Sequence, residues 1–108
     1  MADVKKDLYS MDEFNVMLPE GIVRSVLYNF MWQMEYKLKK NDHKSGWRDL
    51  PIEALFKMLM LEIEEFKIAH EFFGIEEARK ELVDVSNFCM ILHDRLGMEE
   101  DKNNGATK

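Results

Sequence analysis

The sequence has a single cysteine, Cys89, and this scarcity limits the chemistry open to the chain. One cysteine cannot form an intrachain disulfide, and the first residues, MADVKKDLYS, lack the apolar run of a signal peptide, so a reducing, cytoplasmic location is expected. Cys89 lies among apolar residues at helical spacing, with no basic neighbour one turn away. We expect a buried and inert thiol, because a reactive cysteine needs a cation nearby.

Long apolar runs and clusters of cations are also missing. No stretch of about 18 apolar residues is present that could cross a bilayer. The chain has 15 Lys and Arg residues against 21 Asp and Glu residues, a net charge of −6. Proteins that bind nucleic acids or anionic membranes need clustered Lys and Arg. The composition therefore argues against nucleic-acid and membrane partners, although a small phosphorylated ligand that carries its own metal ion is still allowed.

Apolar and charged residues are both abundant, at 46% and 33% of the 108 residues. This size and composition fit one globular domain rather than a disordered segment. No segment alternates between apolar and polar residues with a period of two, so the expected fold class is all-α. We assign residues 1–97 to a single helical domain and expect the polar tail, residues 98–108, to be disordered.

Apolar periodicity, caps and turn-forming residues divide the chain into expected helices. Ser10 and Glu13 have capping-box spacing and open a short helix that would end before Pro19. The segment from Asn41 to Pro51 is dense in turn-forming residues and reads as a loop. The other helices are expected from Ile22 to Lys40, from Pro51 to Phe73 with an end at Gly74, and from Glu76 to Leu96 with an end at Gly97.

Four acidic residues fall on or beside the apolar faces of the last two expected helices: Glu62, Glu65, Glu81 and Asp84. At about 100° per residue, Glu62 lies in the middle of its apolar stripe, with Glu65 at the edge. Glu81 lies within about 40° of the centre of the other stripe, with Asp84 on the same flank. A tight turn at Gly74 would make the two helices an antiparallel hairpin. At about 1.5 Å per residue, all four acids would then share a band roughly 11–18 Å from the turn.

Four ionised carboxylates against an apolar wall repel each other and lose hydration, which is costly unless cations compensate. The intervening helix faces offer no Lys or Arg at matching positions. Mg²⁺, or alternatively Mn²⁺, prefers oxygen ligands of this kind and leaves positions open for water and phosphates. The sequence therefore predicts a metal site. The alternatives are an ordinary solvated acidic face and an interface that pairs these acids with cations of another subunit.

The order and spacing of the four acids resemble a known signature. Glu62-x-x-Glu65, then residues 66–80, then Glu81-x-x-Asp84 is similar to the ExxE…ExxD pattern of the MazG-like all-α nucleoside triphosphate pyrophosphohydrolases. These proteins are related to dimeric dUTPases and phosphoribosyl-ATP pyrophosphohydrolases. The pattern is fairly specific when both halves lie on helices, as expected here.

The resemblance covers most of the chain, from about Phe30 to Leu96. The run KLKKNDHKSGW, residues 37–47, is similar to a segment found before the first acidic helix in some of these proteins. Leu61 departs from the pattern, because a second glutamate is usual at that position. This difference leaves the four metal ligands intact.

The resemblance implies a hydrolase that cleaves a nucleoside triphosphate, (d)NTP, between the α- and β-phosphates to give (d)NMP and pyrophosphate. It implies Mg²⁺ held by Glu62, Glu65, Glu81 and Asp84. The ion would neutralise the triphosphate and lower the pKa of an attacking water. Glu65 is our candidate for the carboxylate that accepts the proton of that water.

Five residues are candidates for contacts with the substrate. Asn87, one turn beyond the last acid, would hydrogen-bond a sugar hydroxyl or a phosphate, or has only a structural role. Lys44 and Arg48 would bind phosphate oxygens, and Trp47 would stack on the base or else plug the end of the helical bundle. Lys37 is a further candidate, or an ordinary helix-surface cation.

Apolar residues outnumber the positions that one small core needs, and they include Trp32, Tyr36 and Met60 off the main stripes. We therefore expect a helical bundle completed by oligomerisation, as a homodimer or homotetramer. In MazG-like proteins a neighbouring subunit often completes the active site. The alternative function is a catalytically silent helical oligomer that binds a protein or a nucleotide without turnover.

Overall fold

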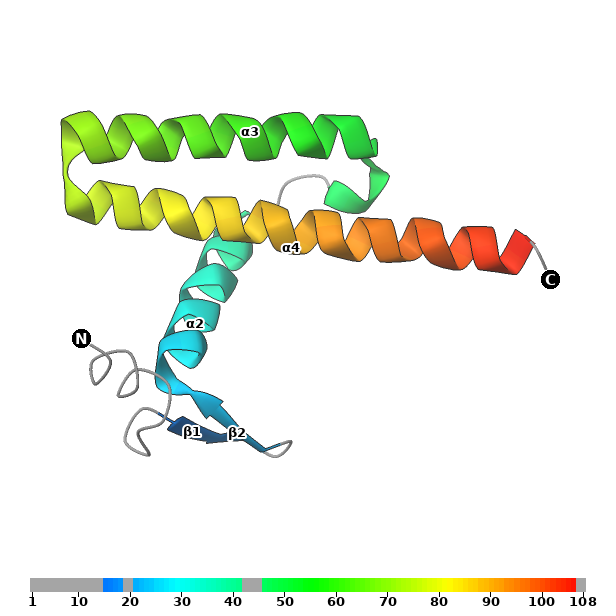
Figure 1. The fold of residues 1–108 in the computed structure, drawn as a ribbon, viewed down its shortest axis with the longest axis horizontal. Coiled ribbons are helices and arrows are strands. Elements are labelled where there is room, and N and C mark those ends of the chain that lie inside the picture. The colour runs from blue at the N-terminus through cyan, green and yellow to red at the C-terminus, as the bar shows by residue number, and fades with distance from the viewer. Residues whose placement is uncertain (1–14, 19–20, 42–45, 107–108) are drawn as a thin grey trace, which may run out of the picture.

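The computed structural model describes residues 15–18, 21–41 and 46–106, and helices dominate that part of the chain (Figure 1). The predicted all-α class is confirmed for the bulk of the fold, although two short strands precede the helices. The elements in chain order are β1 (Asn15–Leu18), β2 (Gly21–Arg24), α2 (Ser25–Lys40), the 3-10 turn η2 (Trp47–Asp49), α3 (Ile52–Ile68), the π-helical turn η3 (Ala69–Phe73) and α4 (Ile75–Ala106).

The two strands form an antiparallel hairpin in which Val16 pairs with Val23. The expected start of a helix at Ile22 is therefore wrong, since α2 begins at Ser25. Ile22 and Val23 are β-branched and favour an extended backbone. Gly21 has a φ of +138°, which no helix uses. The preference of Ile22 and Val23 for an extended backbone therefore overrides the helical spacing of the apolar residues, from which the helix start was predicted.

The short helix expected before Pro19 is also wrong in its last residues, because residues 15–18 form a strand. Its expected capping box, Ser10 and Glu13, lies outside the described residues. The structure therefore tests only the end of that helix.

α3 and α4 lie side by side and antiparallel, as the sequence predicts (Figure 1). The chain reverses at Gly74, whose φ of +104° lies in the left-handed region that glycine adopts without strain. The N–H of Gly74 donates to the carbonyl of Ala69 at 2.9 Å and closes the π-helical turn. This turn sets the register of the two helices and hence the heights at which their side chains meet.

The buried core lies where the η2 turn folds onto α3 and α4. Leu55, which is fully buried, forms its centre together with Ile91 and Leu92. Trp47 and Phe88 are among the half-buried side chains that pack against this cluster. The expected loop is confirmed where it is described, and it contributes an aromatic wall to the core.

α2 runs across the hairpin rather than along it, and its C-terminal half reaches α4 (Figure 1). Two polar contacts join the helices there. The Asn87 side chain donates to the carbonyl of Met34 at 3.2 Å, and Lys37 pairs with Asp84 at 3.2 Å. The described residues of one chain therefore form a hairpin with a crossing helix, and they do not close a bundle.

α4 continues beyond Gly97 to Ala106, so the expected helix end at Leu96 is wrong, and so is the disorder expected in the tail as far as the helix extends. One glycine costs a helix only about 1 kcal/mol and does not force it to stop. Glu99 lies 3.7 Å from Arg95 and 4.0 Å from Lys102, and such pairs at helical spacing support the added turns.

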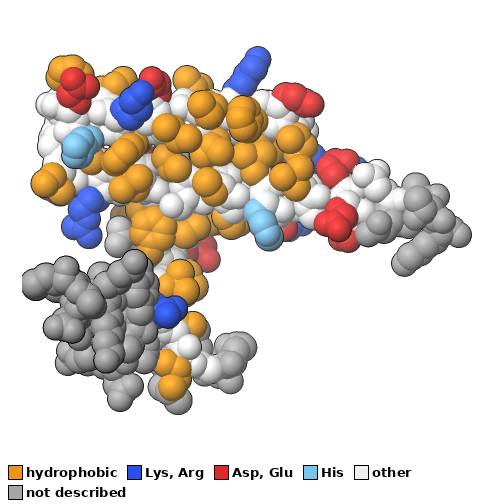
Figure 2. Space-filling view, in the orientation of Figure 1, with side chains coloured by type: hydrophobic (Ala, Val, Ile, Leu, Met, Phe, Trp, Pro, Cys, Tyr) orange, Lys and Arg blue, Asp and Glu red, His pale blue; other side chains and the backbone are white. Residues whose placement is uncertain are grey.

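Large hydrophobic side chains cover much of the α3 and α4 face in Figure 2. Cys89 is exposed as well, which corrects the expectation of a buried thiol. The buried positions of α4 include Ala78, Val83 and Ile91, so the buried face is rotated away from Cys89. No helix in the described part of the chain is both long and apolar enough to cross a membrane.

We expect Leu55→Ala to lower the free energy of unfolding by about 2–5 kcal/mol, because it leaves a cavity at the centre of a small core. Lys57→Ala, at an exposed position of the same helix, should change it by less than about 0.5 kcal/mol. Urea denaturation followed by circular dichroism measures both values. Equal losses in the two variants would show that Leu55 is not the centre of the core.

Candidate metal centre

Three of the four predicted acids meet across the hairpin. Glu62 lies on α3, and Glu81 and Asp84 lie on α4, each half-buried. Each offers one carboxylate oxygen, and these three oxygens all lie within 4.8 Å of one another. The acids of the two helices therefore meet within the band of heights above the Gly74 turn that the helical rise predicts.

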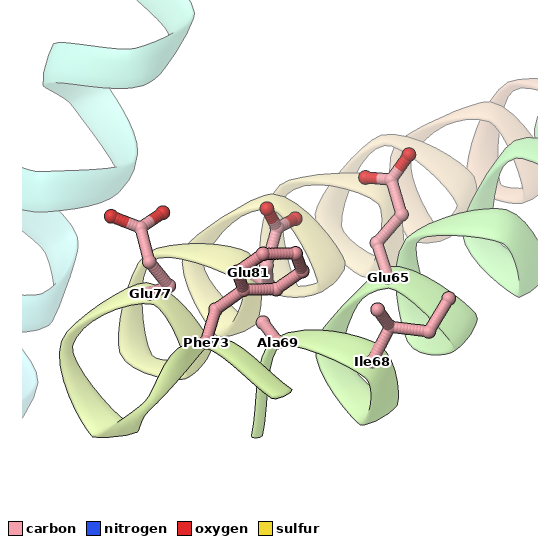
Figure 3. Close-up of a pocket in the computed structure, with 6 residues that line it drawn as sticks. All are labelled: Glu65, Ile68, Ala69, Phe73, Glu77 and Glu81. Atoms are coloured by element: carbon pink, nitrogen blue, oxygen red, sulfur yellow. The ribbon is translucent and has the colours of Figure 1, made fainter. Parts of the chain in front are cut away.

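Glu65, the fourth acid, is exposed and lies at the edge of this group. Its carboxyl group is close enough to raise the pKa of both Glu62 and Glu81. Figure 3 shows the carboxyl groups of Glu65 and Glu81 projecting to the same side of the hairpin, together with that of Glu77. The structure therefore places Glu65 beside the three-oxygen cluster rather than within it.

Burial and mutual repulsion raise the pKa of two of these acids. Burial, followed by the charge of Glu65, raises the pKa of Glu62 from 4.5 to about 7, with smaller contributions from Asp84 and Glu81. Burial is also the largest cause of the raised pKa of Glu81, and Lys37 opposes it. One oxygen of Glu62 and one of Glu81 are buried without a hydrogen-bond partner. The cluster therefore lacks enough positive charge and enough donors for its carboxylates.

Lys37 lies 3.2 Å from Asp84 and corrects the expectation that no cation faces the acids. Lys37 belongs to α2. The spacing of residues within α3 and α4 gives no information about where α2 packs, so this contact was not predicted. One ammonium group compensates part of the charge, since it opposes the rise in the pKa of Glu81 while that pKa remains raised. Lys37 is therefore an internal counter-ion of the cluster and not an ordinary surface cation.

A pocket of about 400 Å³ opens beside the acid cluster and includes several predicted substrate contacts. Glu62 and Asp84 form one part of its wall. The other polar or aromatic lining residues are Lys37, Asn41, Trp47 and Asn87. Leu55, Phe88 and Ile91 supply apolar surface. This combination of a charged wall, a few polar groups and an apolar floor is typical of small-molecule sites.

Asn87 has the structural role that was one of its two predicted interpretations. It is 5% exposed, and its amide nitrogen donates to the carbonyl of Met34. Its carbonyl oxygen, Oδ1, is buried without a partner, although the residue lines the pocket. Because Oδ1 can only accept hydrogen bonds, a ligand hydroxyl or N–H suits it, whereas an ionised phosphate does not.

Trp47 and Arg48 share the η2 turn, and Trp47 lines this pocket. Trp47 is half-buried and also packs against the core. Arg48 is exposed, and its guanidinium lies 5.3 Å from the centre of the Trp47 ring. Lys44, the third loop candidate, lies outside the described residues.

Arg95 positions the η2 turn, although it was not predicted as a functional residue. It is 8% exposed, and its guanidinium donates to the carbonyl of Trp47 at 3.3 Å and to the carbonyl of Leu50. A signal was present, because Arg95 follows Ile91 by four residues and Leu92 by three. A cation on the apolar stripe of a helix requires buried acceptors.

Comparison with known proteins gives one relative. No protein-family model and no solved structure matches the chain. A protein of Archaeoglobus fulgidus, described as an uncharacterized protein, is 35% identical over 75 residues, which is 65% of this chain and 81% of the archaeal protein. The chain belongs to the same family as this archaeal protein. That description gives no activity, so a function for the family has to be inferred from the site.

We expect Glu62→Gln to stabilise the metal-free protein at pH 8. The folded pKa of Glu62, about 7, lies above the ordinary value of 4.5, so the folded state holds the extra proton between these values. The contribution of Glu62 to stability is therefore fully present below about pH 4.5 and is lost as pH rises through 7. The neutral glutamine avoids that loss. After allowance for solvent screening, we expect Glu62→Gln to raise the free energy of unfolding by about 1 kcal/mol. This gain corresponds to a rise in Tm of about 4–8 °C.

Thermal denaturation in EDTA from pH 8 to pH 5 measures this effect. The difference between Glu62→Gln and the wild type should shrink as pH falls. Glu64→Gln is the matched control, because Glu64 is exposed and pairs with Lys67, at 3.6 Å on the same helix. A Glu62→Gln protein that is no more stable than the wild type at pH 8 would contradict the repulsion described for this cluster.

Proposed function

We propose that the chain is a Mg²⁺-dependent nucleoside triphosphate pyrophosphohydrolase of the MazG-like kind, which converts (d)NTP to (d)NMP and pyrophosphate. The supporting observation is the meeting of Glu62, Glu81 and Asp84 beside a pocket. Glu62 and Asp84 line this pocket together with Trp47 and Asn87. A cluster of acids alone would be weak support. The buried, unpartnered oxygen of Asn87 adds a second group that is suited to a ligand.

The donor set fits Mg²⁺, with Mn²⁺ as an alternative. Carboxylate oxygens are the ligands that these hard ions prefer. Oxygens on opposite sides of such an ion are about 4 Å apart, so a set within 4.8 Å needs only small side-chain adjustments. The unpartnered oxygens of Glu62 and Glu81 are available as ligands. When bound, the ion would neutralise the triphosphate and favour ionisation of the attacking water.

The side chains of this chain would divide the remaining tasks. Glu65 lies beside the three-oxygen cluster and is exposed, which supports a role for its carboxylate in accepting a proton from water. Asn87 Oδ1 would accept a hydrogen bond from a sugar hydroxyl. Trp47 would contact the base, and the neighbouring Arg48 would bind phosphate oxygens. Lys37 would exchange its contact with Asp84 for a phosphate as the acids gain another cation.

The decisive experiment incubates the protein with the eight common NTPs and dNTPs plus Mg²⁺ and measures pyrophosphate. We expect release from at least one of them. Glu62→Gln should lower the rate by about 10²–10³-fold, the range for removing one group that stabilises developing charge. Glu64→Gln, on the solvated side of the same helix, should keep the wild-type rate. No turnover, together with no Mg²⁺-induced thermal shift, would reject the enzyme and favour the silent oligomer.

We also propose that the chain works as a homodimer or homotetramer. The exposed side of α3 includes Phe56, Met60 and Leu61, each at least half exposed. These residues line an open apolar groove of about 680 Å³. Exposed large apolar side chains that gather in one groove often mark an interface. A second copy offers the same surface, and pairing two such faces about a two-fold axis would cover both.

Sedimentation velocity should therefore show a species larger than the 12.9 kDa chain. Met60→Glu should shift the distribution towards the monomer, because it would bury an unpaired charge in the interface. Arg79→Glu, at an exposed position of α4, is the control for a general effect of added negative charge. A monomeric wild type at all concentrations would contradict the proposed oligomer.

A further inference from the structure

A second pocket, of about 410 Å³, lies between α2 and α4. It differs from the rest of this acidic protein, because three lysines and two large aromatic rings surround it. The α2 side contributes Trp32, Gln33, Tyr36, Lys37 and Lys40, and the α4 side contributes Lys80 and Val83. Its size is within the range of small-molecule sites, about 300–1,000 Å³.

The aromatic rings of this pocket are accessible. Trp32 is 52% exposed and Tyr36 is 64% exposed. The Lys40 ammonium lies 5.1 Å from the centre of the Tyr36 ring, so a cation and an aromatic face are already in contact. A planar heterocycle stacks readily on such faces, whichever base it is.

The lysines of this pocket are held by weak, exchangeable contacts. Lys80 lies 3.3 Å from Glu77 and 3.9 Å from Glu76, and all three side chains are more than half exposed. Surface pairs of this kind contribute little to stability, so a dianionic phosphate can replace them. Lys37 is held more firmly, by half-buried Asp84. The cations and rings together match a ligand with a planar base at one end and phosphate at the other.

We propose that this pocket is a nucleotide-binding site, separate from the pocket at the acid cluster. The base lies against Trp32 and Tyr36, and the phosphate lies among Lys37, Lys40 and Lys80. Binding there needs no metal ion, so this part stands whether or not the chain hydrolyses nucleotides. Only the link to the metal centre, through Lys37, rests on the proposed function.

Lys37 lines both pockets and provides that link. A phosphate in the second pocket attracts Lys37 away from Asp84, and a divalent ion at the acid cluster displaces it from the other side. Each ligand therefore breaks the same ion pair, and the ligand that binds second no longer has to break it. The two sites are coupled positively, and the coupling is reciprocal.

A second copy of the chain is the competing occupant of this surface, because Trp32 and Tyr36 are also candidates for an interface. The positions of the residues around α2 allow a nucleotide and a second copy to use different faces of this helix. Trp32, Tyr36 and Lys40 follow each other at intervals of four and form one row. Leu27 and Met31, both exposed, lie roughly 100° or more around the helix from that row. Apolar association can therefore use the second face and leave the pocket open.

Tryptophan fluorescence tests the proposal directly, because the chain has only two tryptophans. In Trp47→Phe, Trp32 is the sole reporter. Titration with adenosine monophosphate in EDTA should quench its emission to saturation, whereas adenosine and inorganic triphosphate should bind at least tenfold more weakly. The double variant Lys40→Ala and Lys80→Ala in the same background should lose the saturable signal. Lys57→Ala with Lys67→Ala, two exposed lysines of α3, should keep it.

Calorimetric titration of the wild type and of the two double-lysine variants gives the same comparison without altering Trp47, should Trp47→Phe not fold. Absence of saturable binding would overturn the proposal, and so would equal affinity for inorganic triphosphate. Emission of Trp32 that changes with protein concentration would assign the surface to a second copy. A response that requires both Mg²⁺ and Glu62 would make the pocket an extension of the metal site, against the proposal.

The coupling is measured as the change in nucleotide affinity when Mg²⁺ is added. The wild type should bind adenosine monophosphate at least threefold more tightly with Mg²⁺, and Lys37→Gln should lose this gain. A gain that persists in Lys37→Gln would remove Lys37 as the link. Saturable binding at Trp32 in a protein that hydrolyses none of the eight nucleotides would reject the enzyme and support this site.

Discussion

Repulsion among half-buried carboxylates is the constraint on which the rest of this structure depends. The Gly74 turn sets the register of α3 and α4, and this register brings Glu62 against Glu81 and Asp84. Desolvation then makes the ionised forms costly, as the raised pKa values of Glu62 and Glu81 show. Selection for stability alone would favour apolar residues at the positions of these three acids. The presence of the acids beside a pocket indicates a use for concentrated negative charge.

The packing of α2 against the hairpin also depends on the charge of the acid cluster. Lys37 supplies a positive charge to Asp84, and Asn87 fixes the carbonyl of Met34 one turn away. Few other groups hold this helix against α4, and much of its apolar surface is exposed. The charge state of the cluster therefore bears on the docking of a whole helix, because protonation or a bound cation changes the strength of one of its two polar attachments.

The hairpin and the heights of its acids could be predicted because both depend on local geometry. Glycine ends a helix, and helical rise converts distance from Gly74 into height. The counter-ion could not be predicted in this way, since Lys37 reaches Asp84 from a helix 47 residues earlier in the chain. Arg95 was missed for a related reason, because its acceptors are backbone carbonyls of a turn, which residue types do not reveal. The strand at Ile22 shows backbone preference overriding apolar spacing.

Because the core is small, the helices around the acid cluster would also depend on oligomerisation for their stability. Few large apolar side chains besides Leu55, Ile91 and Leu92 are buried among the described residues, which is little for a chain of this length. A second interface of the proposed oligomer, on the free apolar face of α2 and additional to the one on α3, would hold this helix by packing as well as by Lys37 and Asn87. Lys37 could then leave Asp84 without releasing α2. The proposed oligomer would therefore allow the metal centre to exchange its internal cation for an external one while the pocket between the helices keeps its shape.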